Sequence, residues 1–76
     1  MTGPLHRVRT GKTAVVRAVA PDTAGRRLMD LGFVPGTRVR VLRTSPLGDP
    51  RAYLVRGAVI ALRREDAARI LVSEGA

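Results

Sequence analysis

Residues 37–62 read TRVRVLRTSPLGDPRAYLVRGAVIAL, and this stretch decides the fold. At its start Val39 and Val41 alternate with arginines, which is the pattern of a strand that buries one face and exposes the other. The alternation slips at Leu42 and Arg43, which indicates a β-bulge or the end of the strand. A loop rich in proline and glycine then separates this strand from the next apolar run, as in a hairpin.

Further apolar runs predict more strands. Residues 52–56 and 58–62 are rich in β-branched and other apolar side chains, and a tight turn at Gly57 separates them. Residues 13–19 form a similar run before them, and residues 70–72 form a closing run after them. Short strands joined by local hairpins predict a mostly β fold, a small antiparallel β-barrel, whose closure would remove exposed strand edges.

One α-helix is predicted near residues 22–31, and a short helical turn is predicted over residues 64–69. Asp22 or Thr23 can cap the start of the helix, and Gly32 can end it in a left-handed conformation. A small barrel needs its few large side chains inside. The apolar side chains predicted to face the core in this region are Ala24, Leu28, Leu31 and Phe33.

Length and composition bound the architecture. The chain has 76 residues, of which 45% are hydrophobic, so residues 1–76 are predicted to form a single globular domain. The N-terminal arm, about residues 1–9, is predicted to be loose. Ala52–Leu62 is the longest apolar segment and is too short to span a bilayer. Because the sequence has neither cysteines nor a secretory signal, the protein is predicted to be cytoplasmic.

The charge balance is strongly positive, with 14 basic and 6 acidic residues and a net charge of +8. Such a balance favours nucleic acid, an anionic membrane surface or an acidic protein as a partner. The residues that could form one basic face across neighbouring strands are Arg38, Arg40, Arg43 and Arg56. Single-strand binders offer several aromatic stacking platforms, whereas this chain has only Phe33 and Tyr53. We therefore expect a protein-docking or solvated face, and DNA binding that is weak, sequence-indifferent and lost at physiological salt.

The sequence holds no recognisable constellation for catalysis or metal binding. It contains no cysteine, no phosphate-binding loop and no nucleophile motif, and its acidic residues are scattered. His6 is the single histidine, is predicted to be solvent-exposed, and has no second His or Cys at ligand spacing. We expect no enzymatic activity, no cofactor and no tight metal site within one chain, while a metal site shared between chains stays open.

The loop SPLGDP holds one apolar side chain at its centre, which is unusual for a polar hairpin turn. Pro46 and Pro50 restrict the backbone, Gly48 permits a turn with positive φ, and Asp49 can accept hydrogen bonds from nearby N–H groups. Leu47 could cover the barrel as a lid or point outward to a partner, and we favour the outward orientation. The predicted partner-binding residues are Pro46, Leu47, Gly48, Asp49, Pro50, Arg38, Arg40 and Arg43.

The stretch LMDLGFVPGTRVRVLRTSPLGDPRAYLVRGAVIALRREDAARILV resembles the FeoA family, the small accessory proteins of bacterial ferrous iron transport. The similarity extends roughly from Leu5 to Val72. The segments that carry it are Gly11-Lys12, Leu31–Gly36, Ser45–Pro50, Ile60–Arg63 and the ending from Ala67 to Ile70. Their order and spacing together, rather than any one segment, are specific to the family.

This resemblance implies an SH3-like β-barrel with an added helix, and a protein that is not an enzyme. It implies an action on FeoB, a large membrane transporter with a cytoplasmic GTPase domain, in its assembly or in its nucleotide cycle. The protein would then lie at the inner face of the membrane through this partner, and oligomerisation stays open. The same fold forms the C-terminal module of iron-dependent DtxR-type repressors. The alternative function is therefore that of a nucleic-acid-binding or metal-repressor-associated module.

Overall fold

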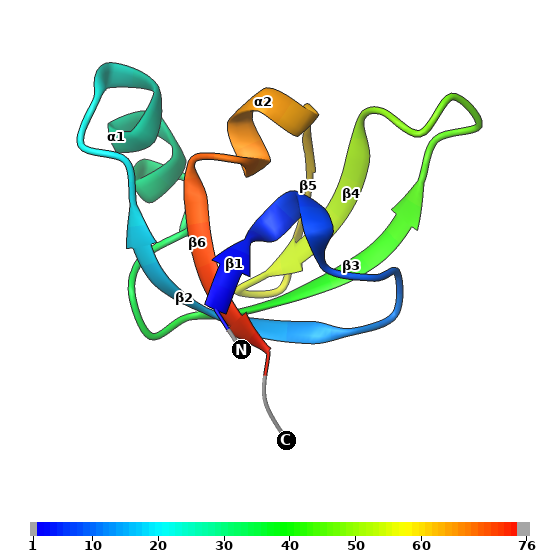
Figure 1. Ribbon diagram of the computed structural model, residues 1–76, viewed down its shortest axis with the longest axis horizontal. Coiled ribbons are helices and arrows are strands. Elements are labelled where there is room, and N and C mark those ends of the chain that lie inside the picture. Colours follow the sequence, from blue (N-terminus) through cyan, green and yellow to red (C-terminus); the bar gives the residue numbers. More distant parts are fainter. Residues whose placement is uncertain (1, 75–76) are drawn as a thin grey trace.

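The computed structural model describes residues 2–74, which form one strongly curved antiparallel sheet with two α-helices along its upper side (Figure 1). The sheet has the strand order β1-β6-β2-β3-β4-β5. Its strands are β1 (Thr2–Pro4), β2 (Thr13–Val19), β3 (Arg38–Thr44), β4 (Arg51–Val55), β5 (Ala58–Leu62) and β6 (Ile70–Glu74). The helices are the 3-10 helix η1 (Leu5–Arg7), α1 (Thr23–Asp30) and the short α2 (Arg64–Ala67).

The strand pattern of residues 37–62 is confirmed. Val39 and Val41 are fully buried, whereas Arg38 and Arg40 are exposed. The predicted bulge is present as well, because the register between β3 and β4 shifts between Val41 and Arg43. The turn between β4 and β5 is formed by Arg56 and Gly57, both with positive φ, as a tight hairpin requires.

The start of α1 is fixed by Asp22, which settles the choice between the two predicted caps. Its side chain accepts a hydrogen bond of 2.7 Å from the backbone N–H of Gly25. Only glycine fits at that position, because a Cβ would lie 1.7 Å from the carbonyl oxygen of Ala20. Asp22 also forms an ion pair of 3.2 Å with Arg69, which links the start of α1 to the residue before β6.

The end of α1 confirms Gly32 as the residue that terminates it. Gly32 has φ of 115°, its N–H donates to the carbonyl of Met29, and the N–H of Phe33 donates to the carbonyl of Leu28. Phe33 is fully buried, as predicted. The prediction that Leu31 faces the core is wrong, since its side chain is 46% exposed. The chain reverses at Gly32, so that Phe33 rather than Leu31 supplies the buried side chain next to the end of α1.

The N-terminal arm is not loose, and that prediction is wrong. β1 pairs with β6, with Gly3 opposite Val72, so the sheet has a sixth strand. Leu5 in η1 is fully buried and belongs to the same core cluster as Tyr53. The physical reason is that a domain this small buries little surface, and the arm adds a fully buried leucine to its core.

Closure of the barrel is incomplete, which corrects the expectation that the fold removes its strand edges. The sheet curls around the core, but β1 and β5 are its terminal strands and do not pair with each other. η1, with its buried Leu5, packs side chains between the sheet and the helices. This packing stands where a closed barrel would have a ladder of hydrogen bonds. Within residues 2–74 the sheet therefore has two edges at which no further strand pairs.

A matched pair of leucine truncations tests this description of the core. Leu5→Ala should lower the free energy of unfolding by about 2–5 kcal/mol, because it leaves a cavity in the core. Leu47→Ala should change it by no more than about 0.5 kcal/mol, because Leu47 is 93% exposed. Urea denaturation followed by circular dichroism would measure both. Equal effects of the two substitutions would contradict the structure.

Candidate docking surface

The loop between β3 and β4 projects away from the rest of the molecule (Figure 1). Its turn is closed by a hydrogen bond of 2.8 Å from the N–H of Gly48 to the carbonyl of Ser45, and Gly48 has the predicted positive φ of 86°. The base is closed by the N–H of Ser45, which donates to the carbonyl of Pro50. Leu47 lies at the tip and is 93% exposed, so the lid interpretation is wrong and its side chain points to solvent.

Asp49 holds this loop in place through a contact that the sequence did not indicate. We predicted hydrogen bonds to N–H groups nearby in the loop. Instead, Oδ1 of Asp49 accepts a hydrogen bond of 2.9 Å from the backbone N–H of Arg64, the first residue of α2. The carboxylate therefore satisfies a free N–H at the start of α2, and the loop is tied to the body of the protein.

The predicted basic residues are divided between two places on the outer face. Arg38 and Arg40 are exposed and lie on β3, where Arg40 is opposite Leu54 of β4. Arg43 lies beyond the bulge and borders a shallow groove of about 310 Å³ at the base of the hairpin. The groove is lined by Arg43, Thr44, Ser45, Pro46, Pro50, Arg51, Ala52 and Ala61. The structure thus brings three predicted residues, Arg43 and the two prolines, into one groove.

Arg51 has a structural role that the sequence analysis missed. Its guanidinium donates through Nη1 to the carbonyl of His6 and through Nη2 to the carbonyl of Val8. It also lies 5.6 Å from the centre of the Tyr53 ring, close enough for a cation–π contact. The sequence could have indicated that Arg51 lies on the same face of β4 as Tyr53, because residues two apart on a strand share one face. Burial raises the pKa of the Tyr53 phenol beneath it.

His6 is partly buried, so the prediction of a solvent-exposed side chain is wrong. Desolvation lowers its pKa from the ordinary value, and the positive charges of Arg64, Arg7 and Arg51 lower it further. Its Nδ1 is enclosed and has no hydrogen-bond partner within residues 2–74. Three arginines therefore disfavour the protonated form of this imidazole.

Catalytic and metal chemistry finds little support in the described part of the chain. Residues 2–74 contain no group of three or more His, Cys, Asp or Glu side chains that could hold a metal ion. The expectations of no catalysis and no cofactor stay predictions. No helix among these residues is long and apolar enough to cross a bilayer.

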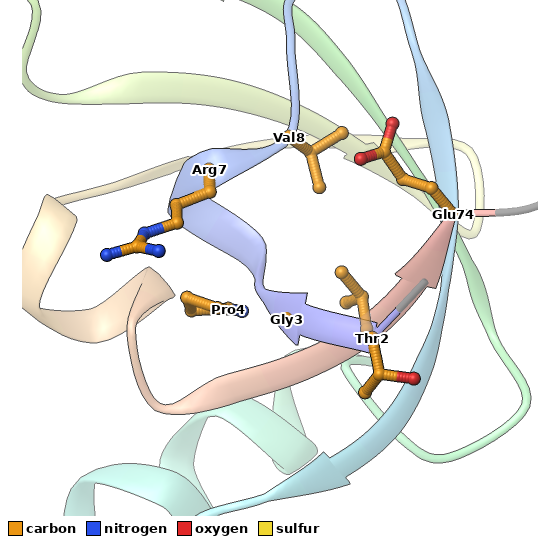
Figure 2. A pocket seen from close by; sticks show the side chains of 7 residues that line it. Thr2, Gly3, Pro4, Arg7, Val8 and Glu74 are labelled. Atoms are coloured by element: carbon orange, nitrogen blue, oxygen red, sulfur yellow. The ribbon is translucent and has the colours of Figure 1, made fainter.

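A second hollow, of about 270 Å³, lies at the opposite edge of the sheet between β1, η1 and β6 (Figure 2). It is lined by Thr2, Gly3, Pro4, Arg7, Val8, Val72 and Glu74. It contains none of the predicted partner-binding residues. The candidate docking surface is therefore the loop 45–50 together with the groove below it.

These features define a class of protein: a small curled β-sheet with a basic outer face and a loop that exposes one leucine, as in a binding module. The model of the FeoA domain matches residues 3–74. The chain belongs to the FeoA family.

Relatives support this membership. The chain is 39% identical over 69 residues to a Porphyromonas gingivalis protein in which Fe(2+) transport protein A is fused to the Fe(2+) transporter FeoB. The match covers 90% of this chain but only 8% of the fusion protein. The FeoA protein of Chlorobium tepidum is 42% identical, with a TM-score of 0.86, over 96% of this chain and 70% of that one.

The fold is SH3-like, as predicted. The FeoA of Stenotrophomonas maltophilia, a prokaryotic SH3-domain protein solved with zinc, is 36% identical with a TM-score of 0.83. The match covers 96% of this chain and 89% of that chain. A manganese-dependent transcriptional repressor has the same fold, at 23% identity and a TM-score of 0.83, and this chain covers 41% of its length. At that identity the likeness concerns the fold alone.

Removal of the Arg51 side chain tests its structural role. Arg51→Ala should lower the free energy of unfolding by about 1.5–3 kcal/mol, because two backbone carbonyls lose a charged donor. Arg43→Ala, on the same hairpin and exposed, should change it by no more than about 0.5 kcal/mol. Chemical denaturation at one pH would compare them. A difference too small to measure would mean that Arg51 does not hold the N-terminal arm.

The environment of His6 predicts a pH dependence of stability. Its pKa is lowered in the folded protein from the value of 6.5 that we assign to the unfolded chain. The unfolded chain therefore binds more protons than the folded protein between the folded pKa and 6.5. The contribution of His6 to the free energy of unfolding is fully present above pH 6.5 and is lost as the pH drops toward the folded pKa. Denaturation at about pH 7.5 and about pH 5.5 would measure this loss. His6→Gln should remove part of it, and an identical loss in both proteins would refute the assignment.

Proposed function

We propose that this chain is an accessory protein of ferrous iron transport that docks onto a FeoB-type membrane transporter through its 45–50 loop. The fused relative supports this partner, because one polypeptide there joins an FeoA part to an FeoB part. The observation that carries the proposal is the 93% exposure of Leu47 on a loop anchored through Asp49. A pre-ordered apolar tip of this kind loses little entropy on docking and is suited to be a binding hot spot.

Charge supports an acidic partner surface. The net charge is +8, and Arg38, Arg40 and Arg43 are all exposed on the side of the sheet that leads to the loop. Such a face speeds association with a negatively charged surface more than it adds affinity. Anionic lipids around the transporter would attract the same arginines, which supports a location in the cytoplasm at the inner face of the membrane. The transporter's assembly or its nucleotide cycle is the step on which the bound protein acts.

The alternative, a nucleic-acid-binding or repressor-associated module, is favoured by the positive charge alone. No Phe or Tyr ring is exposed for nucleic-acid bases to stack on, because Phe33 and Tyr53, the only Phe and Tyr of the sequence, are fully buried. A docking module for protein explains both the charge and the exposed leucine. We infer a binding function without catalysis and without a resident cofactor.

Substitution of the loop tip tests the docking proposal. Leu47→Asp should leave the free energy of unfolding within about 0.5 kcal/mol of the wild type, because the side chain is in solvent. It should abolish recovery of FeoB when the tagged protein is incubated with detergent-solubilised membranes. Leu47→Met keeps an apolar side chain of similar volume and should retain recovery. Full recovery by a folded Leu47→Asp protein would show that the loop is not the docking site.

A further inference from the structure

The two free edges of the sheet differ in how well they are protected. β1 has three residues and ends at Pro4, which lacks a backbone donor. β5 has five residues, AVIAL, without a charged side chain, a proline or a register shift against β4. Soluble proteins usually protect an edge strand with one of these devices, because an unprotected edge can pair with another chain. β5 is therefore the edge at which a strand could be added.

The hairpin register shows which backbone groups of β5 are free. The Arg56-Gly57 turn has positive φ at both residues, 50° and 78°, and Val55 is opposite Ala58. In a hairpin of this type the residues that flank the turn exchange hydrogen bonds, and the bonded pairs then alternate. Ile60 and Leu62 accordingly face β4 with their N–H and C=O groups. Val59 and Ala61 direct theirs to the free edge, and both residues are exposed.

The surface beside this edge suits an extended chain. Ala61 is opposite Ala52, and these two small residues lie in the groove beside Pro46 and Pro50. Val59 is 57% exposed and adds an apolar position two residues along the same strand. A strand paired with β5 would place alternate side chains on this face, next to Val59 and over the groove at Ala61.

Charge selects the occupant. Arg56 and Arg63 flank the two ends of β5, and none of the residues between them is acidic. A second copy of the chain pairing antiparallel through β5 would bring Arg56 near the Arg63-Arg64 end of the other copy, and would join two chains of net charge +8. An acidic segment meets complementary charge at both ends of the strand and at Arg43 in the groove.

We propose that the free edge of β5 binds an extended, acidic segment of a partner protein, which pairs with Val59 and Ala61 as an additional strand. This inference rests on the proposed function in that the segment belongs to the transporter or its associated proteins. Main-chain hydrogen bonds supply the register, and the Arg56, Arg63 and Arg43 side chains select acidic over basic segments.

A synthetic peptide tests the edge directly. The probe is a capped peptide of about nine residues in which Glu and Val alternate. One control has the same pattern of Lys and Val. The other is the Glu-Val peptide N-methylated at the alternate amides that would pair with β5. We expect the Glu-Val peptide to shift the amide resonances of Val59 and Ala61. The Lys-Val peptide and the form N-methylated on the pairing side should bind at least about tenfold more weakly. Equal binding of the Glu-Val and Lys-Val peptides would overturn the proposal.

A single substitution provides a matched test on the protein side. Ala61→Pro removes one outward N–H while leaving the hydrogen bonds of Ile60 and Leu62 to β4, as prolines at strand edges do. It should weaken binding of the Glu-Val peptide by about tenfold or more, whereas Ala61→Ser should stay within about threefold of the wild type. If Ala61→Pro disturbs the fold, the N-methylated peptide on the wild-type protein decides the question. Unchanged affinity in a folded Ala61→Pro protein would refute the proposal.

Recovery of FeoB separates this inference from the proposed function. If the wild type recovers FeoB and Ala61→Pro recovers it equally well, β5 is not the docking edge, and the proposed function stands. If the wild type fails to recover FeoB but binds the acidic peptide at Val59 and Ala61, the edge stands and the proposed partner is wrong. A wild-type dimer that Ala61→Pro converts to a monomer would assign the edge to a second copy and overturn the inference.

Discussion

The structure depends on one contact, that of the Arg51 guanidinium with the carbonyls of His6 and Val8. The contact joins the start of β4 to the arm that carries Leu5, and it lies over the ring of Tyr53. Since β1 and β5 do not pair, no ladder of backbone hydrogen bonds closes the sheet at this end. A side-chain cation performs that task by satisfying two carbonyls that would otherwise lie at the margin of the core.

Closure by side chains has a consequence for binding. A barrel closed by hydrogen bonds has no edge to offer, whereas this sheet retains two. At one of them the strand is short and ends in proline, and at the other β5 is longer and uncharged. The device that closes the core thus leaves free main-chain groups at β5, next to a groove that Arg51 itself helps to line. The contact that holds the N-terminal arm and the edge proposed for recognition therefore lie at the same end of the molecule.

Local patterns predicted the parts of the fold that local interactions determine. The alternation of Val39 and Val41, the bulge after them and the glycines at positive φ all follow from the period of a strand or the geometry of a turn. Leu31 is a local error, because the helix ends at Gly32 and Phe33 takes the core position instead. The other errors concern contacts between distant residues. Arg51 reaches carbonyls 45 and 43 residues earlier in the chain, and no spacing rule links such positions. For the same reason the burial of Leu5 and His6 could not be predicted from the apparently patternless arm.

The 45–50 loop and the β5 edge are linked by a hydrogen bond and a shared groove, so a partner could contact both at once. Asp49 bonds the loop to Arg64, the first residue of α2. Only Arg63 separates Arg64 from the end of β5. Pro46 and Pro50 line the same groove as Ala61. A chain that pairs with β5 therefore runs toward a loop whose backbone is already fixed. In the proposed complex, hydrogen bonds along the edge would give direction and register, and the exposed Leu47 beyond the groove would add affinity at little cost in entropy.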